Sequence, residues 1–360
     1  MSINKPQNYV MPPEWASHAG TMLTWPHNRQ TWPDERLERV EQVYIELVKW
    51  IVSFEPVLLF VNDKGIKERV LNYLHHQNID TEKIEIVIQP VNDVWVRDCG
   101  PIMVKHRKNE TYAIVNWEYN AWGEKYPPWS DDNKLPEFIA NRYGLPTFEP
   151  GIVLEGGAID TNGTGVFLTT ESVLLNENRN PNLTKKQVEE YLSSYLGAEK
   201  VIWLKTGLAG DDTDGHIDGI ARFVNESTII TSVCEDENNL NHDALKENYE
   251  ILKRATDQAG KPFTVIPIPL PETKIDGETV DGSEHVPASY INFYILNEAV
   301  LIPLYDDRYD RAVTETFSEL FPERRIIGFP CSDLVWGQGS IHCITQQLYG
   351  VDIPVGKSTL

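Results

Sequence analysis

Cysteine is scarce in this chain, and the few cysteines are not arranged for cross-linking. There are four in 360 residues, and none has the CxxC or paired spacing of a disulfide framework or a structural zinc site. Long apolar runs are lacking too, since no segment approaches the roughly 18 consecutive apolar residues of a membrane span. The segment Met1–Pro6 has no apolar stretch of the kind that directs secretion. We therefore predict a cytoplasmic protein with no membrane partner.

Positive charge is the second shortage. Lys and Arg number 32 against 54 Asp and Glu, which gives a formal net charge of −22. Such a field repels nucleic acid and anionic membrane surfaces, so neither is expected as a partner, whereas small cations are attracted. Solubility alone would also account for this charge. It gains functional meaning only if a binding site is acidic as well.

Linkers rich in Pro, Ser or Gly are absent as well, so composition marks no boundary and we predict one domain over residues 1–360. Within it a module recurs, consisting of a helix, a short apolar strand, a polar turn and a pair of strands. The 3.6-residue spacing of apolar side chains predicts helices over 34–54, 64–76, 184–196, 243–257 and 309–321, the third opened by a capping box. Apolar runs after these helices predict strands at 85–88, 201–204, 263–266 and 325–328.

Strand pairs complete the modules, at 101–104 with 113–117, 157–160 with 166–169, 217–224 with 229–233, and 290–296 with 299–304. A further strand, 341–346, has no partner nearby in sequence, and 20–25 is the obvious candidate. A repeat whose last unit is completed by the first strand closes into a ring, which removes exposed sheet edges. The pattern therefore predicts an α/β fold built from repeated units in a ring.

Cys343 stands in a Gly-framed turn, where a thiol can be exposed and activated. Three other turns hold the same place in their modules and carry acids or a histidine beside glycine, at 95–101, 154–157 and 211–218. Equivalent turns of a ring meet at one end. The side chains expected to converge there are Asp98, Glu155, His216, Asp218 and Cys343.

Spacing also ranks the histidines. His216 and Asp218 are two residues apart on a predicted strand, so their side chains should emerge on one face. His342 adjoins Cys343 and would point away from it in an extended strand. We therefore predict that His216 is the acid/base partner of the thiol and that His342 is structural.

Each of these residues also has a simpler explanation. Single acids near turns are usually caps or solvated, and the acidic run 211–218 could bind a hard cation, although it lacks the full calcium-loop pattern. Cys99, Cys234 and Cys331 lie in or beside apolar runs and are predicted to be packed thiols. A thiol, a histidine and three carboxylates together suit a guanidinium, because carboxylates accept its planar N–H pairs and a thiolate can attack its carbon.

At these residues the sequence resembles the agmatine deiminase and bacterial peptidylarginine deiminase family of guanidine-modifying enzymes. The resemblance spans nearly the whole chain in order and rests on residues 15–25, 95–101, 120–123, 155–157, 174–181, 215–218 and 341–347. It implies a five-bladed, pseudosymmetric α/β propeller of the pentein type with an axial active site. It also implies hydrolysis of agmatine to N-carbamoylputrescine and ammonia, as in putrescine biosynthesis, without a metal or organic cofactor.

The resemblance implies a role for each converging residue. Cys343 would be the nucleophile that forms an amidino-thioether, and His216 the general acid and base. Asp98 and Asp218 would clamp the guanidinium, with Glu155 contacting it and supporting proton handling. For substrate binding we add two tryptophans of the matching segments, Trp95 and Trp122, the latter as a wall for the far end. The partner expected is a small cationic guanidine, and a homo-oligomer is considered.

Some positions depart from the pattern expected of agmatine deiminases, among them Cys99, Asp214, Gly219 and the turn 336–340. The most consequential is Arg222, four residues after Asp218. We favour an ion pair with a neighbouring acid for Arg222, because buried charges are paired, and its competing role is to hold a substrate carboxylate. Free or peptidyl arginine thus stays open as the substrate. The same residue types would also fit an amidinotransferase, a carboxylate-rich metal hydrolase or a non-catalytic cation-binding protein.

Overall fold

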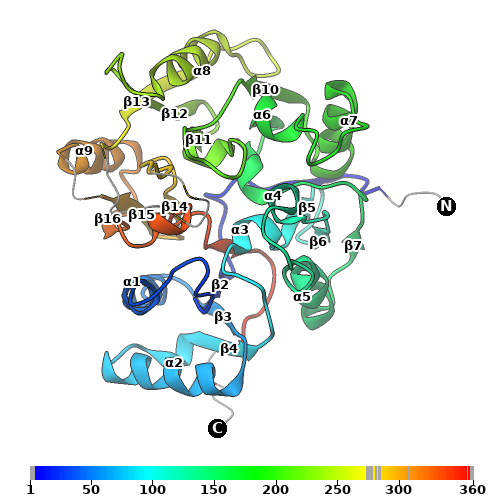
Figure 1. Ribbon diagram of the computed structural model, residues 1–360. Helices are drawn as coiled ribbons and strands as arrows, with labels where there is room; N and C mark the ends of the chain where they lie inside the picture. Colours follow the sequence, from blue (N-terminus) through cyan, green and yellow to red (C-terminus); the bar gives the residue numbers. More distant parts are fainter. Residues whose placement is uncertain are drawn as a thin grey trace.

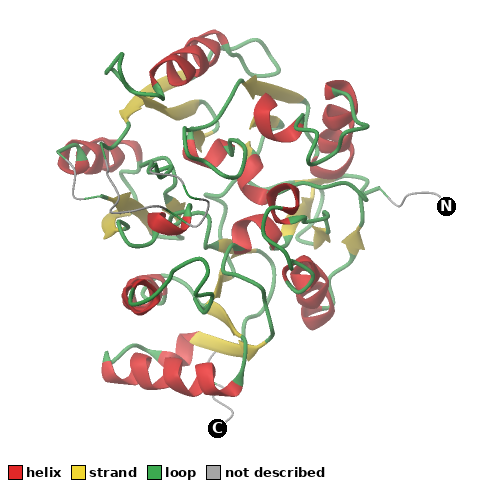
Figure 2. Ribbon diagram, viewed as in Figure 1, coloured by secondary structure: helices red, strands yellow, loops and turns green. Residues whose placement is uncertain are grey.

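The computed structural model describes residues 5–272, 279, 282, 285–305, 308–354 and 356. The first four residues, part of the segment used to predict localisation, lie outside these ranges. Within them the chain forms a mixed α/β structure with five separate sheets of three or four strands. The sheets follow one another around the centre of the molecule, and the longer helices lie outside them (Figure 1, Figure 2).

One sheet joins the two ends of the chain. Its order is β17-β2-β3-β4, formed by Gln346–Leu348, Gly20–Thr24, Val57–Val61 and Ile84–Ile88. β17 runs antiparallel to β2, with Gln346 opposite Met22. The predicted partner of the last strand is therefore confirmed. The predicted extent is wrong, because residues 341–344 form turns and the strand begins only at Gln346.

The other four sheets each contain one of the predicted strand pairs. Their orders are β1-β5-β6-β7 (Tyr9–Val10, Ile102–His106, Tyr112–Val115, Thr147–Phe148), β10-β9-β8 (Lys200–Leu204, Val166–Thr170, Asp160–Thr161), β11-β12-β13 (Ala221–Asn225, Thr228–Val233, Thr264–Pro269) and β14-β15-β16 (Tyr294–Ile295, Ala299–Leu304, Arg325–Pro330). All four pairs are antiparallel. The second strand of each pair then joins in parallel a strand that follows a helix, as a crossover connection requires.

The longer helices lie where the spacing of apolar side chains in the sequence predicts them. They are α1 (Arg36–Ile51), α2 (Lys64–His76), α7 (Lys185–Leu196), α8 (His242–Arg254) and α9 (Asp310–Leu320). α7 opens with the predicted capping box, in which the Thr184 hydroxyl and the Gln187 side chain each bond the other's backbone N–H. No helix of the described residues is both long and apolar enough to cross a membrane.

Several elements were not predicted. β3 lies between two parallel neighbours and is buried along its length, so it reads as a continuous apolar run without alternation. α5 (Leu135–Tyr143) has only nine residues, too few for a clear period. The remaining helices are short, namely α3 (Val96–Cys99), α4 (Ala121–Glu124) and α6 (Glu171–Leu174), with the 3-10 turns η1 (Thr81–Lys83), η2 (Asp132–Lys134), η3 (Gly156–Ala158), η4 (Ile217–Gly219) and η5 (Val335–Gly337).

Short helical turns occupy the middle of the molecule. α3 contacts η3, and η3 in turn contacts η4. Apolar side chains of the sheets and outer helices form three buried clusters around them. The turns that carry Asp98, Glu155 and Asp218 are thus brought together by the packing of separate sheets.

Candidate active site

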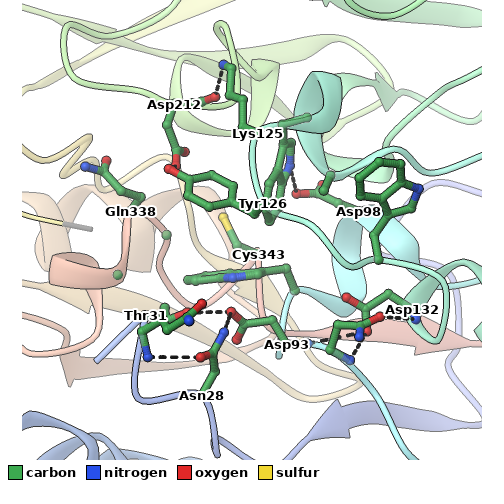
Figure 3. Close-up of a pocket in the computed structure, with 18 of the residues that line it drawn as sticks. Asn28, Thr31, Asp93, Asp98, Lys125, Tyr126, Asp132, Asp212, Gln338 and Cys343 are labelled. Carbon is green, nitrogen blue, oxygen red and sulfur yellow. Dashed lines mark hydrogen bonds between the residues drawn. The ribbon is translucent and has the colours of Figure 1, made fainter. Parts of the chain in front are cut away.

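A cavity of about 580 Å³ opens at the turns, and Cys343 lies in its wall (Figure 3). The loops that line it come from after β2, from around α3 and α4, from before η4 and from after η5. Of the predicted site residues, Cys343, Asp98, Trp95 and Trp122 line the cavity. His216, Glu155 and Asp218 do not line it and lie behind its wall as buried residues.

Asp98 is held in a fixed direction by two neutral donors. It belongs to α3, a single helical turn where a polar loop was predicted. The Gly157 N–H donates to Oδ1 at 2.9 Å, and the Trp122 indole N–H donates to Oδ2 at 3.0 Å. Burial raises the pKa of Asp98 to about 6, because the positive influence of His216 only partly offsets desolvation and the nearby Asp218 and Glu155.

Trp122 reaches Asp98 from an unusual backbone conformation. Its φ of 55° and ψ of 43° lie in the left-handed region, within the kinked segment α4. The ring packs edge-on against Trp95, with 6.4 Å between ring centroids. Both tryptophans therefore stand in the cavity wall, as predicted, and Trp122 also bonds a predicted clamp residue.

His216 lies beside Asp98, although not on a strand. It precedes the 3-10 turn η4, so the predicted strand through His216 and Asp218 is wrong. Its Nδ1 is 3.5 Å from Asp98 Oδ1, and its Nε2 is buried without a hydrogen-bond partner among the described residues. Burial disfavours the imidazolium, but the carboxylates Asp98, Glu155 and Asp218 outweigh it and raise the pKa of His216.

Gly157 marks the point at which three predicted residues meet. A Cβ atom there would lie 2.6 Å from His216 Nδ1, 2.7 Å from Asp98 Oδ1 and 3.1 Å from Asp218 Oδ2. Only a glycine leaves this space open, because real Cβ atoms do not approach other heavy atoms so closely. The convergence of His216, Asp98 and Asp218 is thus a property of the folded chain.

Asp218 is bonded to the histidine that was predicted to point away. His342 Nδ1 lies 2.7 Å from Asp218 Oδ2, and His342 Nε2 lies 2.8 Å from Glu14 Oε2. Residues 341–344 form turns, so the extended strand assumed for His342 is wrong, while its structural role stays a prediction. Burial raises the pKa of Asp218, but the hydrogen bond to His342 and the charges of His342, His216 and Arg222 together outweigh it, so the pKa lies below its ordinary value.

Glu155 is paired with an arginine. Its Oε1 accepts a hydrogen bond from Arg179 Nε at 2.5 Å, and both side chains are fully buried. Arg179 also donates to Asp214 Oδ2 at 2.7 Å, which anchors it to the loop before His216. Glu155 Oε2 is buried and has no hydrogen-bond partner in the described part of the chain. One oxygen of Glu155 is therefore available for a further contact.

Cys343 is partly buried, and its sulfur is close to two polar side chains. Asn292 Nδ2 lies 3.2 Å from Sγ, and Asp218 Oδ2 lies 3.8 Å away. Burial raises the pKa of the Cys343 thiol well above its ordinary value, and the negative charges of Asp218 and Asp98 add to the effect. Without a bound cation, the arrangement therefore favours the thiol over the thiolate.

Arg222 is placed as the ion-pair prediction requires. It is fully buried, with Nη2 2.6 Å from Glu14 Oε2 and Nε 3.2 Å from Asp160 Oδ1, and it also donates to the carbonyl oxygen of Phe293 at 3.0 Å. It does not line the cavity. Arg222 is therefore committed to protein partners and is not positioned to hold a substrate carboxylate.

Two further expectations concern the packing of the other cysteines and cation binding by the acidic run 211–218. Cys99 and Cys331 are buried, as expected of packed thiols, whereas Cys234 is only partly buried. Among the described residues, no cluster of three or more His, Cys, Asp or Glu side chains is arranged to hold a metal ion.

Three residues that touch the predicted set were not identified as site residues from the sequence, namely Gly157, Arg179 and Asn292, and a fourth, Glu14, reaches Asp218 through His342. Arg179 and Gly157 lie within segments that resemble the family, so those segments contained a usable signal. Glu14 and Asn292 stand in irregular segments without periodicity. Only the three-dimensional arrangement brings these two side chains to the site.

Comparisons with known proteins agree with this geometry. The sequence profile described as Porphyromonas-type peptidyl-arginine deiminase matches residues 10–348. A Legionella pneumophila (strain Paris) protein provisionally named agmatine deiminase is 37% identical over 344 residues, covering 95% of this chain and 96% of its own. The agmatine deiminase of Enterococcus faecalis, solved while catalysing its reaction, has a TM-score of 0.89 at 30% identity, covering 98% of this chain and 99% of that one.

A second solved structure is a cysteine-to-serine variant of the C. jejuni agmatine deiminase with substrate bound. It has a TM-score of 0.84 at 32% identity, covering 95% of this chain and 97% of that one. The profile match alone extends over most of the sequence. The chain belongs to the Porphyromonas-type peptidyl-arginine deiminase family.

Proposed function

We propose that this chain is an agmatine deiminase, which converts agmatine and water to N-carbamoylputrescine and ammonia. The observation that carries the proposal is the meeting of His216, Asp98 and Asp218 at Gly157, beside the cavity thiol of Cys343. Relatives named agmatine deiminases, two of them with solved structures of similar fold, support the same activity.

In the proposed reaction, the Cys343 sulfur attacks the guanidinium carbon and forms a C–S bond. Asp98 and Asp218 accept N–H groups of the guanidinium and orient its carbon, and Glu155 offers its unpaired oxygen to the same group. The positive charge of the substrate opposes the two carboxylates that disfavour the thiolate. Binding of the substrate therefore lowers the pKa of the nucleophile at the moment of use.

His216 handles the protons in both halves of the reaction. Its free Nε2, with the pKa raised by the surrounding carboxylates, donates a proton as the C–N bond breaks and ammonia leaves. The same nitrogen then takes a proton from a water that attacks the amidino-thioether carbon. The C–S bond breaks, the thiolate is regenerated, and the carbamoyl product is released. The reaction as written uses no metal or organic cofactor.

The charges of the cavity favour agmatine over arginine. Four aspartates line it, namely Asp93, Asp98, Asp132 and Asp212; burial raises the pKa of Asp132 to about 8, so the other three carry the negative charge at pH 7. The lining Lys125 and Arg29 are paired with Asp214 and Glu38. A substrate with a cation at each end suits such a cavity, whereas the carboxylate of free arginine would be repelled. Trp95 and Trp122 provide apolar walls for the aliphatic chain between the two cations.

We also propose the finer description of the fold, a single domain over residues 1–360 that forms a five-bladed, pseudosymmetric α/β propeller of the pentein type. The five sheets around central turns and the pairing of β17 with β2 support it. The acidic balance of the chain supports a small cationic guanidine as its partner and argues against nucleic acid or a membrane. A cytoplasmic location and a homo-oligomeric state complete the proposal.

The experiment that tests the function compares ammonia release by the purified protein from agmatine, free arginine and an arginine-containing peptide. Agmatine should give the highest kcat/KM. Equal or better turnover of arginine or of the peptide would overturn the assignment of agmatine and favour an arginine deiminase. Product formation only in the presence of an acceptor amine would indicate an amidinotransferase instead.

Substitution of the nucleophile tests the mechanism. Cys343→Ala should lower ammonia release from agmatine by at least about 1,000-fold, because the covalent step is lost. Cys234→Ser is the matched control, since Cys234 is also partly buried but does not line the cavity, and it should keep its activity. Unchanged turnover in Cys343→Ala would contradict the covalent route. Loss of wild-type turnover on chelation would point to a metal hydrolase.

A further inference from the structure

A buried chain of charged side chains extends from the cavity wall to the N-terminal part of the protein. Asp218 Oδ2, His342 and Glu14 Oε2 follow one another at 2.7 Å and 2.8 Å. All three residues are at most 6% exposed. Glu14 also accepts the backbone N–H of Ile295 through Oε1 at 2.8 Å, so its carboxylate is held from both sides.

The partners of His342 determine its protonation. Carboxylate oxygens face both ring nitrogens, and ionised carboxylates only accept hydrogen bonds. Both contacts can be hydrogen bonds only if both ring nitrogens carry a proton, which makes the ring an imidazolium. The charged groups at the Glu14 end of this chain are Arg222, 2.6 Å from Glu14 Oε2, Arg97, 3.8 Å from the same oxygen, and Asp160, 3.2 Å from Arg222. At the Asp218 end, His216 and Asp98 meet Asp218 at Gly157, and the Cys343 sulfur lies 3.8 Å from Asp218 Oδ2.

The two carboxylates at Gly157 are therefore held differently. Asp218 is bonded to His342, an imidazole with a carboxylate oxygen at each ring nitrogen. The hydrogen-bond donors on Asp98 are the neutral Gly157 amide and Trp122 indole. No hydrogen bond of the described residues involves Asp218 Oδ1, so that oxygen is available to a ligand while Oδ2 is fixed by His342.

We propose that His342, held as an imidazolium between Asp218 and Glu14, is a positioning residue that keeps Asp218 ionised and directed at the guanidinium of the substrate. This inference rests on the proposed function, because it concerns the same site. It gives His342 a role through Asp218, while His216 remains the acid and base. The lowered pKa of Asp218 and the strongly lowered pKa of Glu14, where Arg222 and His342 overcome the effect of burial, agree with it.

The test measures kcat, KM and the pH profile of kcat/KM for agmatine in His342→Gln. Without His342, the pKa of the buried Asp218 should rise toward that of Asp98, so the acid limb of the profile should reflect two protonations instead of one, becoming steeper and moving up by about half a pH unit. KM should rise about 10- to 100-fold, as expected for loss of a hydrogen bond to a charged group, with a smaller change in kcat. A purely structural residue would lower the melting temperature without moving the acid limb.

His18→Gln is the matched control. His18 is also buried, with Nδ1 3.2 Å from the carboxylate of Glu55 and Nε2 2.6 Å from the backbone carbonyl oxygen of Glu14, but it bonds neither Asp218 nor the carboxylate of Glu14. Its substitution should cost stability and leave the acid limb in place. A wild type that releases no ammonia from agmatine overturns the proposed function. An active wild type with an unchanged profile in His342→Gln overturns only the role of His342.

Two further measurements apply even if His342→Gln does not fold. Glu14→Gln removes one of the two carboxylates without touching the cavity, and should move the acid limb in the same direction by a smaller amount; an unchanged limb contradicts the proposal. In His216→Asn/His18→Gln labelled with ¹⁵N-histidine, one buried imidazole should be doubly protonated; His18→Gln is included because His18 also faces an acceptor at each ring nitrogen. Absence of a doubly protonated imidazole would show that His342 is neutral and would overturn the inference.

Discussion

Asp98 and Asp218 both lie beside Gly157, but their hydrogen-bond partners differ and so do the directions of their pKa shifts. Asp218 is bonded to His342, whereas the hydrogen-bond donors of Asp98 are neutral, and burial raises the pKa of Asp98 to about 6. The positive influence of His216, whose Nδ1 lies 3.5 Å from Asp98 Oδ1, only partly offsets this effect, so a bound guanidinium supplies a further positive charge beside Asp98. Part of the binding free energy of the substrate depends on this single carboxylate being ionised.

This dependence predicts an acid limit of activity. Because the pKa of Asp98 is raised, its charge is present above about pH 6 and is lost as the pH falls through that value. Between pH 7 and pH 5, kcat/KM for agmatine should therefore fall and KM should rise. Steady-state kinetics over this range test the point, with Asp98→Asn expected to lose about 100-fold in kcat/KM at pH 7. A flat profile down to pH 5 would contradict it.

The reactivity of the Cys343 thiol gives a second prediction about a single residue. Since burial, Asp218 and Asp98 all raise the pKa of Cys343, a neutral alkylating agent should modify it slowly at pH 7 and faster as the pH increases. A cationic haloacetamidine should react at least about tenfold faster, because its charge offsets the two carboxylates. Mass spectrometry would locate the label, and Cys343→Ala controls for labelling of Cys234. Equal rates for the two reagents would show that the carboxylates do not control the thiol.

Among the elements, η3 places its second residue where no side chain fits. The backbone of Gly157 donates to Asp98, and its missing side chain leaves space for His216. A 3-10 turn of three residues, Gly156–Ala158, thus lies between His216, the proposed acid/base residue, and Asp98, a proposed clamp residue. The geometry of this turn sets the relative positions of the reacting groups.

Gly157→Ala should therefore lower kcat/KM by about 100-fold, because a displacement of about 1 Å at the reacting groups is costly. Gly219→Ala is the matched control, since Gly219 also lies in a 3-10 turn beside a site residue, and its Cβ would meet only Leu208, at 3.8 Å. Kinetics and thermal unfolding of both variants separate the two effects. Similar kinetic losses in both variants would show that space at Gly157 has no special role.

Sequence reasoning worked well for elements with a clear period or cap. α2 has the bounds that its apolar spacing predicts, and the capping box of α7 is present as read. It failed where a local rule was applied to an irregular turn. The rule that alternate residues of a strand share a face was applied to His216, Asp218 and His342, but none of them lies on a strand. Instead, η4 and the residue before it bring Asp218 and His216 to Gly157, and the turns at 341–344 bring His342 to Asp218. Contacts such as Glu14 with His342 join distant segments, and no local pattern encodes them.

For the whole molecule, the acidic excess and the acidic cavity act in the same direction. The formal net charge is −22, and four aspartates line the cavity that contains Cys343. Attraction over distances longer than a hydrogen bond is screened by salt, while contacts inside the cavity are screened much less. The electric field of the whole protein therefore affects the binding of a cation from solution more than the rate of the chemical step in the cavity.

Raising NaCl from 10 to 500 mM should increase KM for agmatine about two- to tenfold and change kcat little. Initial rates at several ionic strengths measure both constants. A neutral osmolyte at the same osmolarity is the control for general solvent effects. If KM is independent of salt, the acidic excess serves solubility alone.

The pairing of β17 with β2 has a consequence for the time at which the enzyme becomes active. Along the chain, Asp98, Glu155, His216 and Asp218 all precede Cys343, and the strand that closes the first sheet follows directly after it. During translation the carboxylates leave the ribosome first, and the edge of β2 waits unpaired until Gln346–Leu348 has been made. A nascent chain can thus carry most of the proposed binding groups but not the proposed nucleophile. Products of premature termination before Cys343 would be catalytically silent.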